Sequence, residues 1–138
     1  MVKKLAVIVT RGGYNNLLQV CEWITLAASQ GIQVGVLFRD EAASKMSLKK
    51  CKELTFSEGY RGREAHLRDL LRERKKSDLQ ELLRAAKESG DVKFSVCRDS
   101  VGYFSIPVED LIPELDEVQQ VEAFWKEEVS EADQVLTF

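Results

Sequence analysis

Three cysteines, at positions 21, 51 and 97, are the residues of this chain best suited to nucleophilic chemistry. Their wide spacing excludes the Cys-x-x-Cys pairs of redox motifs and zinc sites, and their odd number does not support a disulfide framework. We therefore expect three free thiols in a reducing cytoplasm.

Cys97 is the strongest candidate for a reactive thiol. It ends the alternating apolar and polar stretch 92–97, which predicts a strand, and ligands of open α/β sheets bind at the carboxyl ends of strands. The neighbouring Arg98 and the amides of a short helix capped by Asp99 or Ser100 would favour the nucleophilic thiolate. The charge of Asp99 opposes this effect. An inert cysteine at a strand end is the alternative interpretation.

The other two cysteines are expected to play no part in chemistry. Cys21 falls on the apolar face of a predicted helix, which favours a small core residue. Cys51 stands among lysines that would favour its thiolate, but we expect that segment to be mobile and exposed. The single histidine, His66, has neither a second histidine nor a paired cysteine nearby, so no metal site and no cofactor are predicted.

A Gly12-Gly13 turn follows the first predicted strand and precedes a helix, where an anion could reach the helix amides. It lacks the glycine patterns of dinucleotide-binding folds and P-loops, so a simple tight turn is the competing interpretation. Our alternative function is therefore a non-enzymatic, oligomeric module that binds a nucleotide or anion at this turn and at the carboxyl edge of the sheet.

The elements that must position these residues follow from hydrophobic periodicity. A continuous apolar run at 5–10 predicts a buried strand, and a helix capped by Asn15 or Asn16 then extends to Gly31. Further strands are predicted at 33–38, 92–97, 114–118 and 135–138, and further helices at 77–89 and 119–130. The whole chain, 1–138, is predicted to be one α/β domain with a flavodoxin-like three-layer fold: a mostly parallel sheet of four or five strands with helices on both faces.

Two smaller expectations concern large apolar side chains. The last helix should turn Val121, Phe124, Trp125 and Val129 inward. Trp23 and Trp125 are interpreted as core or interface aromatics.

The charges are distributed unevenly along the chain. Residues 1–89 carry 17 Lys and Arg against 11 Asp and Glu, whereas residues 90–138 carry 3 against 12. Segment 40–76 is predicted to be a charged helical excursion. Within it the basic residues of 61–76 are interleaved with Glu64, Asp69 and Glu73 at helical spacing, which favours a solvated helix over a nucleic-acid site. The apolar run 5–9 is too short for a signal peptide or a membrane span, so a cytoplasmic protein is expected.

The order of these segments resembles the DsrE/DsrF-like family, which includes sulfur-relay subunits of the TusBCD type. The resemblance is carried by the strand and small-residue turn at 5–13, by Phe94-Ser95-Val96-Cys97, and by Gly102 followed by Val108-Glu109-Asp110-Leu111-Ile112. It covers most of the chain except about residues 40–76.

The resemblance implies a sulfur carrier that accepts sulfane sulfur as a persulfide on Cys97 and passes it from a donor protein to an acceptor protein. Relatives that associate with membranes have an apolar excursion where this chain is charged, so no membrane contact is expected. The irregular stretch after Cys97 holds too many apolar residues to bury internally: Phe104, Ile106, Leu111 and Ile112. Together with the resemblance, this predicts a homo-oligomer, a trimer or a hexamer.

Overall fold

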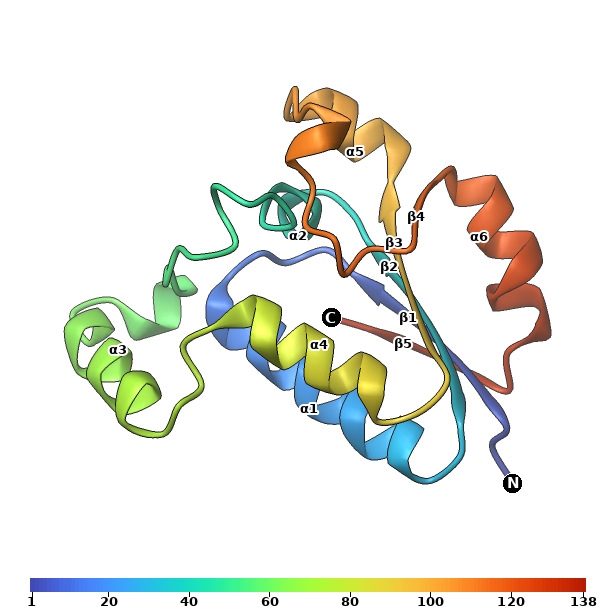
Figure 1. Cartoon of the computed structure of the whole chain (residues 1–138), viewed down its shortest axis with the longest axis horizontal. Coiled ribbons are helices and arrows are strands. Elements are labelled where there is room, and N and C mark those ends of the chain that lie inside the picture. Colours follow the sequence, from blue (N-terminus) through green and yellow to red (C-terminus); the bar gives the residue numbers. More distant parts are fainter.

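A parallel sheet of five strands forms the centre of the protein, and the computed structural model describes every residue from Met1 to Phe138 (Figure 1). The strands lie in the order β4-β3-β2-β1-β5. Their bounds are β1 (Lys4–Val9), β2 (Gln33–Phe38), β3 (Val92–Cys97), β4 (Glu117–Gln119) and β5 (Gln134–Thr137). The predicted α/β fold with a parallel sheet is confirmed.

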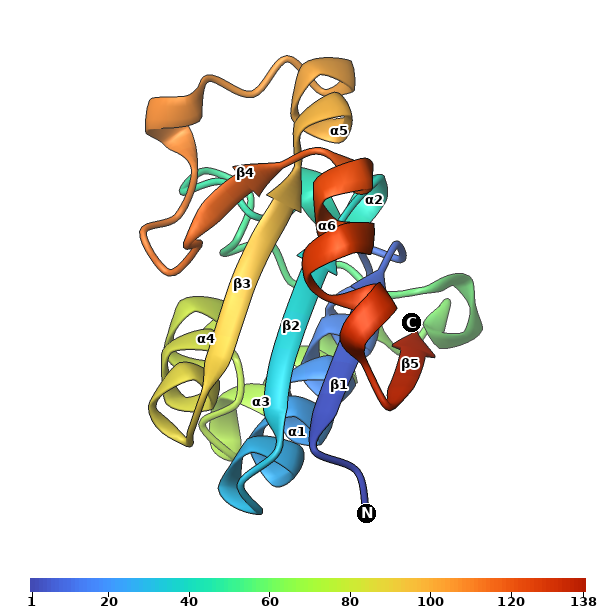
Figure 2. The same ribbon diagram turned by 90° about the vertical axis from the view of Figure 1, so that its right-hand side faces the viewer.

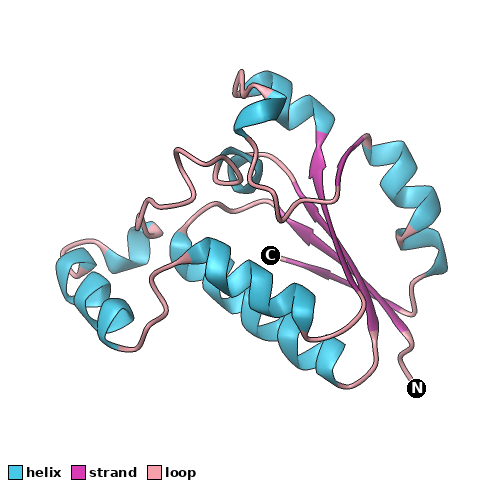
Figure 3. Ribbon diagram, viewed as in Figure 1, coloured by secondary structure: helices cyan, strands magenta, loops and turns pink.

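Helices lie on both faces of this sheet (Figure 3). On one face, α1 (Tyr14–Ser29) and α4 (Leu79–Glu88) pack side by side over β1, β2 and β3. On the other face lies only α6 (Val121–Glu127), followed by the short turn η3 (Val129–Glu131). The two faces are therefore covered very unequally.

The start of α1 differs from the prediction. Its N-cap residue is Gly13, not Asn15 or Asn16. Both asparagine side chains are engaged elsewhere, because Asn15 exchanges hydrogen bonds with Ser57 and Asn16 donates to the Arg11 carbonyl oxygen. The helix ends as predicted, with Gly31 in the left-handed conformation at φ 83°.

The excursion contains α2 (Glu41–Ser44), the turn η1 (Glu58–Tyr60) and α3 (Glu64–Glu73), which stands away from the sheet (Figure 1). The expectation that Cys51 is exposed is wrong, because its side chain is only 2% exposed and belongs to the main core. Its Sγ lies 3.6 Å from the Leu48 carbonyl oxygen and 3.7 Å from Gln80 Oε1, both acceptors for the thiol. Met46, also in this segment, is fully buried in the same core.

The last helix is shorter than predicted and presents a different set of side chains to the sheet. Phe124 is buried, with Val121 and Val129 packed beside it, as expected. Trp125 is 62% exposed, so its inward placement was wrong. Successive helical residues are about 100° apart, so Phe124 shares its face with Glu128 four residues later, and Glu128 is buried instead.

The connection from β3 to β4 consists of α5 (Arg98–Tyr103) and the turn η2 (Val108–Asp110) at the carboxyl edge of the sheet. Of the four apolar residues named for this stretch, Ile112 is buried, and its amide donates to the Met46 carbonyl oxygen, which holds the stretch against the excursion. Phe104 remains exposed, as do Tyr103 and Val108.

We predict that Gly90→Ala destabilises the fold. A Cβ at Gly90 would lie 2.6 Å from the Ala28 carbonyl oxygen, which belongs to the backbone of α1 and cannot yield easily. Overpacking of this kind costs about 1–3 kcal/mol, measurable as a lower urea midpoint of unfolding. The matched control is Gly59→Ala, where a Cβ meets nothing within 4 Å. Its free energy of unfolding should change by no more than about 0.5 kcal/mol. Equal urea midpoints for the two variants would contradict the close approach of Gly90 to the Ala28 carbonyl oxygen.

Candidate functional site

Cys97 is the last residue of β3 and the N-cap residue of α5. Side chains alternate between the faces of a strand, so Phe94 and Val96 enter the main core while Cys97 faces the side covered by α6. The Cys97 side chain is 0% exposed. It packs in a separate cluster of four buried residues with Ala6, Leu37 and Phe124.

This small cluster depends on one element for its cover. The main core holds 25 buried residues under α1, α4 and the excursion, and Cys21 and Cys51 both belong to it. Phe124 is the one member of the Cys97 cluster that does not belong to the sheet, and partly buried side chains from α6, η3 and β1 pack around the cluster. In the ribbon, α6 lies over this face of the sheet (Figure 2). Cys97 is therefore covered by a short helix, whereas Cys21 and Cys51 lie in the main core, Cys21 at its edge beside an open cavity between α1 and α4.

Gln119 is the nearest polar neighbour in the sheet, because it pairs in register with Cys97 across β3 and β4. Its side chain is 2% exposed, and its Nε2 donates to Glu127 Oε2 at 2.7 Å. Its Oε1 is buried with no hydrogen-bond partner, an arrangement that costs about 1–3 kcal/mol. Sequence reasoning missed Gln119, having assigned it to the last helix. The alternation of Glu117-Val118-Gln119 was the available strand signal.

Arg98, the other predicted site residue, is exposed, and so is Asp99. No hydrogen bond joins the Arg98 guanidinium to the thiol, and neither Glu109 nor Asp110 forms an ion pair with it. The structure thus places Arg98 beside Cys97 in the chain but directs the two side chains into different environments. Any influence of Arg98 on the thiol is a through-space charge effect, screened over about 8 Å at physiological salt.

Asp40, which follows β2 at the same edge of the sheet, has a strained backbone. Its φ of 52° lies in the region that favours glycine, and such a residue costs about 1–3 kcal/mol. Its amide donates to Ser100 Oγ at 2.8 Å, and Ser100 is buried. This bond ties the end of β2 to α5, immediately after Cys97.

The Gly12-Gly13 turn has a packing role in the structure. A Cβ at Gly12 would lie 2.7 Å from the Glu41 carbonyl oxygen, so the glycine allows two backbones to approach. The first amide of α1, from Tyr14, donates to the Thr55 carbonyl oxygen at 2.7 Å. The turn borders an open cavity of about 460 Å³ with Arg11 and Lys45 on its wall, but Tyr14, whose amide begins the helix, is not among the residues that line it. These contacts favour the tight-turn interpretation.

The remaining candidates lie away from this edge. Cys21 is a core residue as predicted, and burial raises the pKa of its thiol to about 12. Burial also raises the pKa of the Cys51 thiol, which outweighs the opposing effect of Lys52. His66 is exposed on α3. The structure contains no cluster of three His, Cys, Asp or Glu side chains that could hold a metal ion, and none of its helices is long and apolar enough to span a membrane.

Comparison with known proteins identifies the family. A model of the DsrE/DsrF/DrsH-like family matches residues 23–136, which include Cys97 and the stretch 108–112 but not β1 or the Gly12-Gly13 turn. A solved structure, a protein of unknown function (MTH1491) from Methanobacterium thermoautotrophicum, has the same fold, with a TM-score of 0.62 over 99% of both chains at 12% identity. No protein of curated function matches the sequence significantly. With more than half of its length matched by the family model, the chain belongs to the DsrE/DsrF/DrsH-like family.

Proposed function

We propose that this protein is a cytoplasmic sulfur carrier that accepts sulfane sulfur as a persulfide on Cys97 and passes it to a partner protein. Membership of the family indicates a role in sulfur relay. The observation that carries the finer proposal is the separation of the three thiols. Cys21 and Cys51 lie in the main core, whereas Cys97 ends a strand at the carboxyl edge of the sheet under a single short helix.

The proposed step is a transfer between thiols. The Cys97 thiolate attacks the terminal sulfur of a donor persulfide, and a new sulfur–sulfur bond forms as the donor's own sulfur–sulfur bond breaks. The electron pair of the broken bond stays on the donor cysteine as its thiolate, and the terminal sulfur keeps its proton. The same exchange with an acceptor thiolate then unloads Cys97. Nothing is oxidised or reduced overall.

The chemistry asks little of the surrounding residues. It requires a thiolate, a supporting charge and room for a second cysteine to approach. Arg98 supplies the positive charge nearest to Cys97 in the chain, and the exposed Asp99 opposes it. The donor and acceptor are expected to be proteins, because the transfer is an exchange between cysteine thiols.

Our first prediction concerns the site of loading. After incubation with a persulfide donor, intact-mass and peptide analysis should show an adduct of about 32 Da, the mass of one sulfur, on Cys97. Cys97→Ser should abolish the adduct, while the matched variants Cys21→Ser and Cys51→Ser should keep it. An adduct that survives in Cys97→Ser, or the absence of one in the unmodified protein, would refute the proposal.

The second prediction concerns the charges beside the thiol. Near neutral pH, Arg98→Ala should slow alkylation of Cys97 and Asp99→Asn should accelerate it, each by about two- to fivefold because exposed charges are screened. At a pH high enough to ionise the thiol fully, the three rates should converge, which a purely structural effect would not produce. Identical rates at neutral pH would show that Arg98 has no part in the chemistry.

The third prediction concerns assembly. Tyr103, Phe104 and Val108 expose apolar surface just beyond Cys97, and we propose that a second copy of the chain covers it in a trimer or hexamer. Light scattering at micromolar concentration should give a multiple of the 15.7 kDa chain mass. Val108→Glu should lower that mass, whereas Leu26→Glu, at an exposed position on α1, which lies away from α5 (Figure 1), should not. A monomer in solution would contradict the proposal.

A further inference from the structure

Cys97 cannot react as it stands, because the side chain is fully buried under Phe124. A donor or acceptor cysteine must reach within bonding distance of its sulfur, so some part of the structure must move. The segment that covers the thiol is residues 120–132, which joins β4 to β5 and contains α6 and η3 (Figure 2). We call these residues the cover.

The cover has a small apolar anchor. Phe124 is its only fully buried apolar side chain, and Val121, Val129 and Ala132 are partly buried around it. Trp125, its largest side chain, faces solvent. By contrast, α1 on the opposite face buries seven residues, including Leu17, Val20 and Ile24. Apolar burial therefore holds the cover far less firmly than it holds α1.

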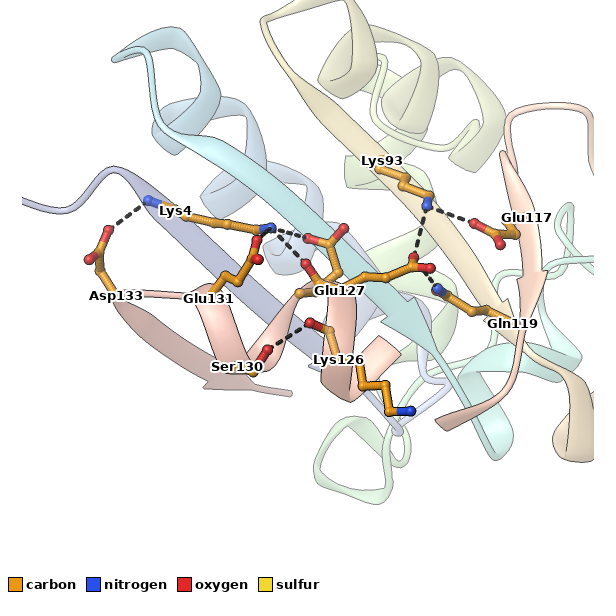
Figure 4. A network of polar contacts seen from close by, with 10 residues as sticks. Lys4, Lys93, Glu117, Gln119, Lys126, Glu127, Ser130, Glu131 and Asp133 are labelled. Atoms are coloured by element: carbon orange, nitrogen blue, oxygen red, sulfur yellow. Dashed lines mark hydrogen bonds and ion pairs between the residues drawn. The ribbon is translucent and has the colours of Figure 1, made fainter. Parts of the chain in front are cut away.

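Polar contacts provide the rest of the attachment (Figure 4). The Lys93 ammonium group on β3 lies 2.6 Å from the Glu117 carboxylate of β4 and 3.6 Å from the Glu127 carboxylate of the cover, which also accepts from Gln119. The Lys4 ammonium group on β1 lies 3.4 Å from Glu128 and 3.5 Å from Glu131, and it donates to the Glu127 carbonyl oxygen. Two lysines of the sheet thus hold three glutamates of the cover.

The sheet is shaped to receive one of these glutamates. The Glu128 carboxylate lies over Gly35 of β2, and a Cβ at that position would overlap it. Glycine weakens a strand, so its presence in the middle of β2 is explained by the space that Glu128 needs. The Lys4–Glu128 pair is largely buried, whereas Lys93 and Glu127 are partly exposed to solvent and to salt.

The closed arrangement also leaves a polar atom unsatisfied. Gln119 Oε1, beside Cys97 in the sheet, is buried without a partner. Lifting the cover would admit water to this oxygen, so the closed state is disfavoured at the position where access to the thiol is needed.

From these contacts we infer that residues 120–132 form a cover latched by ion pairs, which Lys93 and Lys4 hold closed over Cys97 and which opens without unfolding the main core. Its role as a gate for sulfur transfer rests on the proposed function. Its opening is a property of the chain alone.

Alkylation of the three thiols by iodoacetamide, followed peptide by peptide, tests this inference without any sulfur donor. Cys21 lies in the main core and reports its opening. In the unmodified protein Cys97 should be alkylated faster than Cys21. The ratio of the two rates should increase when salt is raised from about 50 to 500 mM, because salt screens the ion pairs that hold the cover. Glu127→Gln and Lys93→Met should raise the Cys97 rate about three- to tenfold and leave the Cys21 rate unchanged.

The matched control is Glu53→Gln, which removes the Lys45–Glu53 pair in the excursion and should alter neither rate. Both latch variants act on partly exposed groups, and their melting temperatures establish that they remain folded. If Cys97 and Cys21 were alkylated at equal rates, and if every variant changed both rates together, the inference that the cover opens independently of the main core would be overturned. If Cys97 were alkylated selectively but never acquired a persulfide from a donor, the proposed function would be overturned and the inference about the cover would still hold.

Discussion

The alternation of side chains along β3 is the constraint on which the rest of this structure depends. Phe94 and Val96 enter the core of 25 residues, so the residues between and after them must face the other side of the sheet. A shift of register by one residue would bury Cys97 with Cys21 and Cys51. The parallel pairing of β3 with β2 and β4 fixes that register and gives the thiol its separate environment.

Much of the fold could be predicted because its signals are local. The apolar runs of β1 and β2 and the glycine after α1 are short-range patterns, and the alternation at 92–97 likewise placed Cys97 at a strand end. The burial of Cys97 could not be predicted, since Phe124 covers it from 27 positions further along the chain. The placement of Trp125 was wrong because it assumed that the buried face of the last helix is entirely apolar. Glu128 takes an inward position instead, since Lys4 of the sheet pairs with its carboxylate.

The uneven distribution of charge along the sequence is partly balanced by ion pairs within the molecule. Acidic residues of the C-terminal part pair with basic residues of the N-terminal part, as Glu114 does with Arg84, Asp116 with Lys87, and Glu128 with Lys4. These pairs fasten the β3–β4 and β4–β5 connections to the rest of the molecule. The uneven charge distribution therefore serves, at these positions, to hold the fold together.

The tight packing around Cys97 has a consequence for a loaded carrier. Interiors have little free volume, and an additional sulfur on this side chain would occupy space now filled by Phe124. If Cys97 carries sulfur as proposed, the empty and loaded forms would then differ in outline at α6, which carries Phe124. An acceptor protein could distinguish the sulfur-loaded carrier from the empty one by its shape before any sulfur–sulfur bond is exchanged. That discrimination would give direction to a transfer whose free energy is close to zero.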